Sequence, residues 1–298
     1  MKEADKLIGC IIGGAIGDAL GGPYEGRTPP FETTDGGHWR LSDDTQLTLA
    51  TCEAITKNNG VPEPSIIAAG FAAWYREARV AGMGASTYKA LSELVRGGHW
   101  ALVGRKGEYA AGNGAAMRSA PLAFCLDPAD PGARQKIRDI SRITHHNEEA
   151  YAGALAVIIA VRAAWDGAWN GRPDLLRQVI EGLPDSRVQD RLIELSELRD
   201  VSIPEVASLF GCSGYVVESV PLALYGAQQI ESLGFEPLLR ELILTGGDTD
   251  TIASIAGQIA GTFSGRSNLP EQMALRLPEL ALIEEIAIGF ARKVTAEL

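Results

Sequence analysis

Residues 7–20, LIGCIIGGAIGDAL, place apolar side chains three and four positions apart along the whole stretch. This spacing predicts a helix with one continuous apolar face. The same stretch holds glycines at positions 9, 13, 14 and 17, although a glycine costs a helix about 1 kcal/mol relative to alanine. A helix accepts that cost where another backbone or a ligand comes very near, and tight core packing alone is the alternative explanation. We therefore expect a helix whose glycine side makes an unusually close contact.

The same helical periodicity continues through most of the chain, and no segment shows the sustained alternation that is typical of a strand. Nothing in the composition divides the chain into two parts, so we expect a single compact domain over residues 1–298. The predicted fold is all-α, with about a dozen helices packed by ridges and grooves. Besides residues 7–20 and 47–55, the expected helices lie at 64–80, 86–96, 132–144, 148–166, 173–182, 186–199, 218–233, 236–244, 250–263 and 278–296.

The composition limits the classes of function. The chain has 298 residues, 46% of them hydrophobic, and a formal net charge of −11. An acidic chain disfavours nucleic acid or an anionic membrane as a partner, because phosphate groups require a basic face. A small anionic ligand is not excluded, since a few backbone N–H groups can hold one.

The sequence also gives expectations about location. The first six residues, MKEADK, are charged and include acids, unlike a secretory signal. The longest apolar run, residues 152–164, is interrupted by Arg162 and is too short to span a bilayer. We therefore expect a cytoplasmic protein. With no C-x-x-C pair, the cysteines are expected to be reduced core residues rather than zinc or redox ligands. They are Cys10, Cys52, Cys125 and Cys212.

A first acidic run, Ser42-Asp43-Asp44-Thr45, precedes the expected helix over residues 47–55. Ser42 is a good N-cap, and Asp43 and Asp44 would occupy the first turn, where the helix dipole favours negative charge. Capping needs only one carboxylate, however, and adjacent carboxylates repel each other. The alternative is that these oxygens bind a hard divalent cation.

A second acidic run, GGDTDT over residues 246–251, begins another expected helix. Asp248 could cap this helix, with Asp250 and Thr251 in its first turn. Two carboxylates and two hydroxyls after a glycine pair are more than capping requires, and residues two and three apart can direct their oxygens to one point. The two runs together indicate a metal centre built from both ends of one domain.

Two long stretches rich in proline or glycine, 21–37 and 97–115, are expected to be functional loops. In the first, Glu25 follows Gly-Gly-Pro-Tyr, where a carboxylate can swing as a gate or serve as a general base; an ordinary surface glutamate is the alternative. Asp18, before this loop, is expected to be a structural acid or one that supports the site. Trp39 and Trp100, in or beside the two loops, are candidates to stack on an adenine, with simple anchoring of the loops as the alternative.

Two further motifs lie between the acidic runs. The stretch GNGAAMR, residues 112–118, predicts a glycine-rich loop that runs into a helix and offers backbone N–H groups to phosphates. Its Arg118 could assist an anion or join a buried ion pair. In THHN, residues 144–147, adjacent histidines on a helix would face different directions, so they form a poor chelating pair. Asn147 is expected to cap the next helix.

These stretches, in this order, resemble the ADP-ribosylglycohydrolase family, which includes dinitrogen-reductase-activating glycohydrolases and ADP-ribosyl-acceptor hydrolases. The resemblance runs from residue 8 to residue 261. Ser42 stands where many members have threonine, and the hydroxyl is retained. The matching stretches are GCIIGGAIGDALGGPYEG, LSDDTQLTLA, GNGAAMRSAPLA, ITHHNEEAYAGA and LTGGDTDTIASIAGQIAG.

The resemblance implies an all-α domain with a central cleft that holds two divalent ions, Mg²⁺ or Mn²⁺. It implies hydrolysis of the glycosidic bond between ADP-ribose and an acceptor, most simply a modified protein side chain. The implied metal residues are Ser42, Asp43, Asp44, Asp248, Asp250 and Thr251. The implied substrate-binding residues are Gly112, Asn113, Gly114 and His145. The catalytic candidates are Glu25, Asp43, Asp44 and Asp250.

Three alternatives remain at the level of sequence. A prenyl-diphosphate enzyme would need a DDxxD-type spacing, and Asp43 and Asp44 are followed by TQL instead. A member of the family that binds ADP-ribose without catalysis would be expected to have lost ligand acids, and none of the six ligand candidates is lost. A hydrolase of another ADP-ribosyl compound, such as a small metabolite or a nucleic-acid adduct, stays open. The sequence leaves undecided the linkage, the choice between Mg²⁺ and Mn²⁺, the general base and the oligomeric state.

Overall fold

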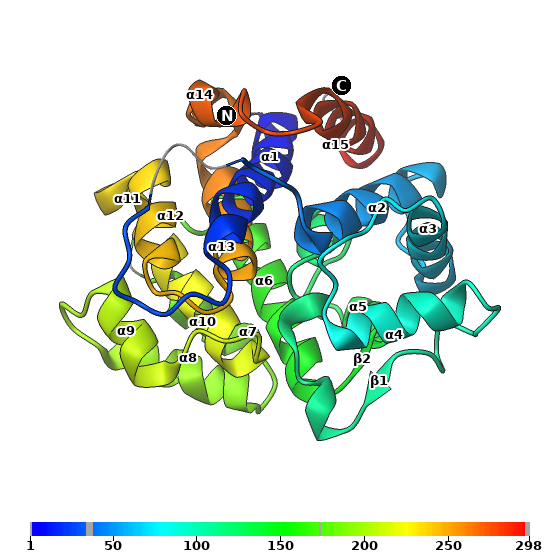
Figure 1. Cartoon of the computed structure of the whole chain (residues 1–298), viewed down its shortest axis with the longest axis horizontal. Helices are drawn as coiled ribbons and strands as arrows, with labels where there is room; N and C mark the ends of the chain where they lie inside the picture. The colour runs from blue at the N-terminus through cyan, green and yellow to red at the C-terminus, as the bar shows by residue number, and fades with distance from the viewer. Residues whose placement is uncertain (1, 34–37, 173, 296–298) are drawn as a thin grey trace.

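Two helices, α1 (Glu3–Gly21) and α13 (Thr249–Ser264), lie side by side at the centre of the molecule (Figure 1). In this computed structural model, which describes residues 2–33, 38–172 and 174–295, they run antiparallel with their backbones in direct contact. A Cβ on Gly13 would lie only 2.3 Å from the carbonyl oxygen of Gly257. A Cβ on Gly17 would lie 2.1 Å from that of Ala253. The close neighbour of the first helix is therefore another backbone, one of the explanations that the sequence left open.

The described residues form fifteen α-helices, five short 3₁₀-helices and two strands of two residues each, so the all-α prediction is confirmed. The helices other than α1 and α13 are α2 (Asp43–Lys57), α3 (Pro64–Arg76), α4 (Ala85–Leu94), α5 (Pro131–Arg142), α6 (Glu148–Asp166), α7 (Leu175–Gly182), α8 (Arg187–Glu197), α9 (Ile203–Phe210), α10 (Val216–Ala227), α11 (Ile230–Leu233), α12 (Phe235–Ile243), α14 (Glu271–Ala274) and α15 (Leu280–Val294). The 3₁₀-helices are η1 (Gly22–Tyr24), η2 (Glu108–Ala110), η3 (Asn113–Ala115), η4 (Ala120–Phe124) and η5 (Arg266–Asn268).

The remaining helices surround the central pair. Figure 1 shows α2 to α5 on one side of it and α8 to α12 on the other, with α6 packed against both central helices. Both ends of the chain lie beside α14 and α15, away from the strands. Helices α1 and α13 thus form the axis to which the two flanking groups attach.

Local capping explains several helix starts. The side chain of Asn147 accepts hydrogen bonds from the backbone N–H groups of Glu149 (2.8 Å) and Ala150 (3.2 Å), as the sequence predicts for α6. At α9, Ser202 and Glu205 form a reciprocal capping box.

Several sequence expectations need correction. The helix expected over 218–233 is two helices, α10 and α11, and the one expected over 64–80 ends at Arg76. Residues 173 and 296, which bound two expected helices, lie outside the described residues. The strands β1 (Arg105–Lys106) and β2 (His145–His146) pair in parallel, and alternation over two residues is too short to read from a sequence. Of the four free cysteines, Cys10 and Cys52 are buried as expected, whereas Cys125 and Cys212 are only partly buried.

One stretch of the described chain is long and apolar enough, by length and composition, to cross a membrane. It is Glu3–Tyr24, which consists of α1 and η1, and 83% of its most apolar window is buried inside the fold. The longest apolar run in the sequence, residues 152–164, forms part of α6 instead. The apolar character of α1 is accounted for by its position in the core.

The contact between α1 and α13 predicts a strong dependence of stability on its glycines. Gly17→Ala should lower the free energy of unfolding by about 1–3 kcal/mol or more, because the new methyl group meets a backbone oxygen that cannot move away. Denaturant unfolding followed by circular dichroism measures this. The matched control is Gly289→Ala on α15, where a Cβ meets nothing within 4 Å and a gain of about 0.4–1 kcal/mol is expected. Equal stability of Gly17→Ala and the unmodified protein would contradict the packing argument.

Candidate active site

The first acidic run forms the start of α2, and its capping role is visible. Ser42 caps the helix, since its Oγ accepts a hydrogen bond from the backbone N–H of Asp44 at 3.2 Å. The hydroxyl of Ser42 also lies 3.1 Å from Oδ2 of Asp44, to which it can donate. Capping therefore uses the serine and leaves the carboxylates of Asp43 and Asp44 for another role.

Asp18 holds this turn in place from α1. Its buried carboxylate accepts hydrogen bonds from the backbone N–H groups of Ser42 (3.1 Å) and Thr45 (3.2 Å), and from the hydroxyl of Thr45. The acid thus ties the end of α1 to the beginning of α2, which supports the site without lining the cleft described below.

The second acidic run is a tight turn held between two other segments. Gly246 and Gly247 have φ values of +72° and +71°, which favour glycine. A Cβ on Gly247 would lie 2.2 Å from the carbonyl oxygen of Cys212, and the next N–H, that of Asp248, donates to the same oxygen at 2.8 Å. The glycine pair is therefore required by the close approach of residue 212 as well as by the turn itself.

The side chain of Asp248 does not cap α13, contrary to one sequence expectation. It occupies the N-cap position but makes no capping hydrogen bond, and its Oδ2 accepts instead from the amide of Asn113 at 2.7 Å. That amide also donates to the hydroxyl of Ser219 at 3.1 Å. Asn113 thus orients a carboxylate of the acidic cluster, and its expected role in binding substrate stays a prediction.

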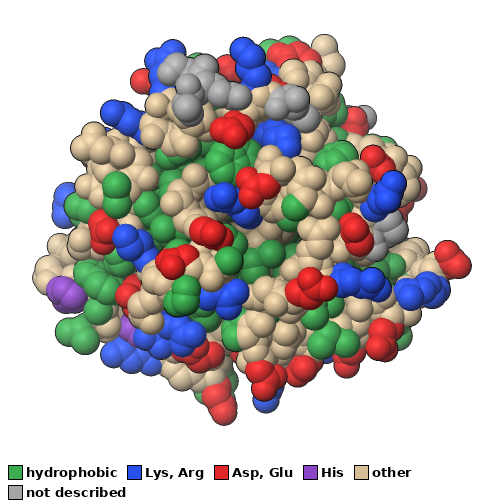
Figure 2. Space-filling view, turned by 180° about the vertical axis from the view of Figure 1, so that it is seen from behind, with side chains coloured by type: hydrophobic (Ala, Val, Ile, Leu, Met, Phe, Trp, Pro, Cys, Tyr) green, Lys and Arg blue, Asp and Glu red, His purple; other side chains and the backbone are tan. Residues whose placement is uncertain are grey.

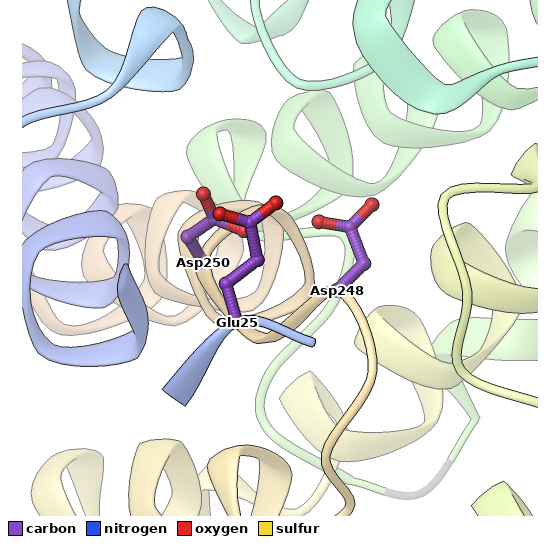
Figure 3. A group of neighbouring side chains, drawn as sticks. All are labelled: Glu25, Asp248 and Asp250. Carbon is purple, nitrogen blue, oxygen red and sulfur yellow. The ribbon is translucent and has the colours of Figure 1, made fainter. Parts of the chain in front are cut away.

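Glu25 joins this cluster through the backbone of its loop. The N–H of Gly26 donates to the carbonyl of Gly247 at 2.8 Å, and the N–H of Gly247 donates to the carbonyl of Arg27 at 3.1 Å. Figure 3 shows the resulting convergence of three carboxylates, with Asp250 at the start of α13. One carboxylate oxygen from each of Glu25, Asp248 and Asp250 lies within 4.8 Å of the other two, which suits a shared cation.

A second group of oxygens lies beside the first. The hydroxyl of Thr251 donates to Oδ2 of Asp44 at 3.1 Å, which joins the two acidic runs directly. The other oxygen of Asp44, Oδ1, is buried and has no hydrogen-bond partner among the described residues. A buried carboxylate oxygen without a partner is costly unless something binds it, so this atom fits a cation ligand.

The electrostatics of the cluster point the same way. Burial, and next the charge of Asp18, raises the pKa of Asp43 to about 7. Burial and the charge of Asp248 raise the pKa of Asp250 to about 9. The pKa of Asp44 is also well above its ordinary value, through burial and then Asp250, and that of Glu25 is raised by burial and Asp248. These carboxylates cannot all ionise together without positive charge between them, and a divalent cation supplies it.

The carboxylates occupy one end of a cleft of about 270 Å³. Glu25, Asp43, Asp44, Asp248, Asp250 and Thr251 all line it, whereas Ser42 does not line it and is hydrogen-bonded to Asp44, which does. Gly112, Asn113, Gly114 and His145 line it as well. The structure thus brings the expected site residues together, and their individual roles remain predictions.

The glycine loop differs from its prediction. It leads into η3, a 3₁₀-helix of three residues, rather than an α-helix, and the N–H of Asn113 is bonded to the carbonyl of Gly214 at 3.1 Å. A Cβ on Gly114 would lie 2.8 Å from Cε1 of His145, and one on Gly112 would lie 3.2 Å from its Nε2. The two glycines thus leave room for the imidazole of His145 against the loop.

The two histidines lie on the strand β2 rather than on a helix, and their side chains do face different directions. His146 Nε2 lies 2.7 Å from the carbonyl oxygen of Val103, whereas His145 lines the cleft. Among buried residues outside the cleft lining, Nη2 of Arg118 donates to Oγ1 of Thr144 at 2.8 Å, and that oxygen lies 2.7 Å from Nδ1 of His145. Arg118 forms no ion pair among the described residues and also donates to the carbonyl of Gly114, so it supports the loop.

The bond from Arg118 determines the direction of the hydrogen bond between Thr144 and His145. A guanidinium can only donate, so Thr144 accepts from Arg118 and has its own proton left for Nδ1 of His145. Nε2 then carries the ring proton and offers a hydrogen-bond donor to the cleft. Burial, with the charge of Arg118, lowers the pKa of His145 to about 3, which keeps the ring neutral.

Sequence reasoning missed two residues of the cleft wall. Arg105 and Tyr109 both line it, and the guanidinium of Arg105 lies 6.0 Å from the centroid of the Tyr109 ring. Tyr109 is 81% exposed, unusual for an aromatic side chain. Their position in the expected functional loop, just before Gly112-Asn113-Gly114, was the sequence feature that could have indicated them. The tryptophans considered instead lie elsewhere, Trp39 under Arg276 (4.4 Å) and Trp100 against His99 (5.4 Å).

Comparison with known proteins shows sequences and a structure that are similar over most of this chain. A sequence model of the family described as ADP-ribosylglycohydrolase matches residues 1–297. The chain is 27% identical to ADP-ribosylhydrolase ARH3 of Homo sapiens, over 91% of this chain and 88% of that protein. It is 26% identical to ADP-ribosylarginine hydrolase Tri1 of Pseudomonas putida, over 96% of this chain and 78% of that protein. A solved structure described as an ADP-ribosylglycohydrolase-related protein complex is similar with a TM-score of 0.74 at 25% identity, covering 98% of this chain and 99% of that one.

The raised pKa values predict how stability depends on pH and cations. Folded Asp43 and Asp250 hold protons that the unfolded chain releases above about pH 4, so in chelator the stability should fall as the pH rises from about 5 to about 9. Mg²⁺ or Mn²⁺ should restore it, by about 5 °C in Tm at about 100 times its Kd, and more at the higher pH. Thermal unfolding followed by fluorescence tests this.

Two variants make that measurement specific. Asp250→Asn should flatten the pH dependence and reduce the shift caused by the cation, whereas Asp185→Asn, an exposed aspartate outside the cleft, should change neither. A cation-induced increase in Tm of the same size at about pH 5 and at about pH 9 would contradict the proposal that the acidic cluster binds the cation.

The hydrogen bonds of His145 predict a single ring tautomer. Nitrogen-15 NMR of labelled histidine should show Nδ1 unprotonated and Nε2 protonated from about pH 5 to about pH 8. Thr144→Val, which removes the hydroxyl but keeps the shape, should lose this preference. A ring protonated at Nδ1 in the unmodified protein would reverse the assigned direction of the hydrogen bond.

Proposed function

Since the chain belongs to the ADP-ribosylglycohydrolase family, we propose that it hydrolyses the bond between ADP-ribose and an acceptor side chain on a protein, with two divalent cations, Mg²⁺ or Mn²⁺, in the cleft. Family membership supports hydrolysis of ADP-ribose glycosidic bonds in general. The names of ARH3 and Tri1 describe ADP-ribosyl hydrolases, and the latter acts on ADP-ribosylarginine. The observation that carries the proposal is the meeting of the two acidic runs at one end of the cleft, with an unpartnered oxygen of Asp44 between them.

The residues of the cluster fit cations of this kind. They offer only oxygen, from carboxylates and hydroxyls, and hard divalent cations prefer such ligands. Bound cations would neutralise the carboxylates and polarise the reacting oxygens. The residues proposed to hold them are Ser42, Asp43, Asp44, Asp248, Asp250 and Thr251, and the geometry adds Glu25 as a further candidate.

The part of the cleft wall beside the carboxylates, formed by the glycine loop, is suited to the ADP-ribose. Gly112 and Gly114 keep the loop against His145, whose Nε2–H can donate to a ribose or phosphate oxygen. Arg105 adds a positive charge to the wall, and a diphosphate carries negative charge. The ribose to be cleaved from its acceptor would then lie at the carboxylate end.

The chemical step uses water as the second reactant. The bond between C1 of the ribose and the acceptor atom breaks, and a bond between C1 and the water oxygen forms. Nearby carboxylates stabilise the positive charge that develops at C1. Glu25, exposed on its loop and with a raised pKa, accepts one proton from the water, and this proton is passed on to the leaving acceptor atom, so that the Glu25 carboxylate is regenerated. The products are ADP-ribose and the unmodified acceptor.

The charge of the chain favours a protein or small-molecule acceptor over a nucleic acid. The chain has a net charge of −11. On the face seen in Figure 2, basic side chains are interspersed with acidic ones, so that face offers no continuous basic surface to phosphates. We propose a cytoplasmic location, in keeping with the expectation from the sequence.

The decisive experiment is release of ADP-ribose from arginine-linked, serine-linked and small-molecule-linked substrates, each with Mg²⁺, with Mn²⁺ and with chelator. We expect release that depends on the cation from at least one linkage. Asp250→Asn should lower kcat by more than about 100-fold, because loss of a direct ligand should exceed the effect of losing an outer partner. Asp185→Asn serves as the matched control.

The outcomes separate the alternatives. Full turnover by Asp250→Asn would contradict the proposal that the acidic cluster is needed for hydrolysis. Cation-dependent binding of ADP-ribose without release from any substrate would instead indicate a binding protein. Release from the small-molecule substrate alone would exclude the protein acceptor.

A further inference from the structure

A second cavity, of about 550 Å³, adjoins the cleft. Glu25, Gly82 and Asp250 line both spaces, so these three residues form the boundary between them. The volume lies within the range of roughly 300–1,000 Å³ that is usual for small-ligand sites. The acidic cluster is therefore reached from two sides.

The two spaces have different walls. The glycine loop, His145 and Arg105 line only the cleft. His38 and Arg40 line only the second cavity, together with apolar side chains that include Pro23 and Leu41. A single substrate that lies across the boundary would place chemically different parts in the two spaces.

We propose that the second cavity is the subsite for the acceptor, and that His38 and Arg40 select acceptors flanked by acidic residues. This inference rests on the proposed function, since it takes the cleft as the site of the ADP-ribose. The bond to be cleaved must lie beside the carboxylates of Glu25 and Asp250, which are the boundary. With ADP-ribose in the cleft, the acceptor has to extend from the other side of that boundary.

The charges of the second cavity give the chemistry of the acceptor. Its lining includes the carboxylates of Glu25 and Asp250, so an acceptor atom with a hydrogen to donate, such as a guanidinium nitrogen or a hydroxyl, is favoured beside them. Its lining also includes the exposed side chains of His38 and Arg40. The guanidinium charge of Arg40, with a ring N–H of His38 as a further donor, favours carboxylates in the residues next to the modified side chain. Pro23 and Leu41 can cover the apolar stem of that side chain.

The test compares two ADP-ribosylated peptides that differ only in their flanking residues, glutamate in one and glutamine in the other. Each is made with modified arginine and with modified serine. We expect the unmodified protein to have a several-fold higher kcat/KM for the glutamate peptide than for the glutamine peptide. The difference should arise from a lower KM and should become smaller at high salt. Arg40→Glu should lower kcat/KM for the glutamate peptide by about 10-fold and for the glutamine peptide by less than about 2-fold.

Two controls exclude general effects of charge. Arg292→Glu on α15 makes the same change of charge at an exposed site that lines neither space, and it should leave both peptides unchanged. Affinity for free ADP-ribose, measured by calorimetry, should be the same in Arg40→Glu and the unmodified protein, because Arg40 does not line the cleft.

Binding of the same peptides, followed by fluorescence anisotropy, separates this inference from the proposed function. If neither peptide is hydrolysed, a preference for the glutamate peptide that Arg40→Glu removes would still support the subsite. Equal binding of the two peptides, or an equal loss of both in Arg40→Glu, would overturn it.

Discussion

The contact between the backbones of α1 and α13 is the constraint on which the site depends. Glycines at four-residue spacing on α1 meet α13 so closely that a Cβ would lie within 2.1–2.4 Å of a backbone oxygen. The contact continues to the last residue of α1, where the hydroxyl of Thr249 donates to the carbonyl of Gly21 at 2.9 Å. Glu25 follows four residues after Gly21, and Asp250 follows Thr249. The packing of two core helices therefore determines that these two carboxylates meet.

The cluster that results is electrostatically unfavourable by itself. Five carboxylates, those of Glu25, Asp43, Asp44, Asp248 and Asp250, line one end of the cleft. The hydrogen bonds of Asp18, on α1, and of Asn113, in the glycine loop, hold this arrangement in place. Because like charges are held close together, binding of a cation should increase the stability of the folded state. Stability, metal affinity and the proposed activity therefore depend on the same atoms.

The cluster also explains why the surrounding loops are long. Residues 22–42 contribute Glu25 to the boundary and His38 and Arg40 to the second cavity, while residues 105–114 form the wall of the cleft. Helices α2 and α13 hold the carboxylates of Asp43, Asp44 and Asp250, and the loops supply Glu25 and the parts proposed to face substrate. Changes in these loops can alter which acceptor fits without disturbing the cluster.

Much of this was predictable from residues close together in the chain. Helix positions follow from apolar spacing over a few turns, and the caps at Ser42 and Asn147 need only residues two or three apart. The two acidic runs were recognisable because they hold more oxygen than capping uses. The sequence also favoured a close contact for the glycines of the first helix, although it could not name the partner.

Other features depended on atoms far apart in the sequence, and there local reasoning failed. Asp248 looked like a cap, but Asn113, 135 residues away, takes its carboxylate. The two histidines were expected on a helix, but pairing with β1 makes them a strand. Gly112 and Gly114 were expected to bind a ligand, and in the structure they also leave room for the ring of His145. The sequence by itself determined the helices, their caps and the type of ligand atom. Only the tertiary structure decided which oxygens share one point, because that distance is set by how closely two helix backbones pack.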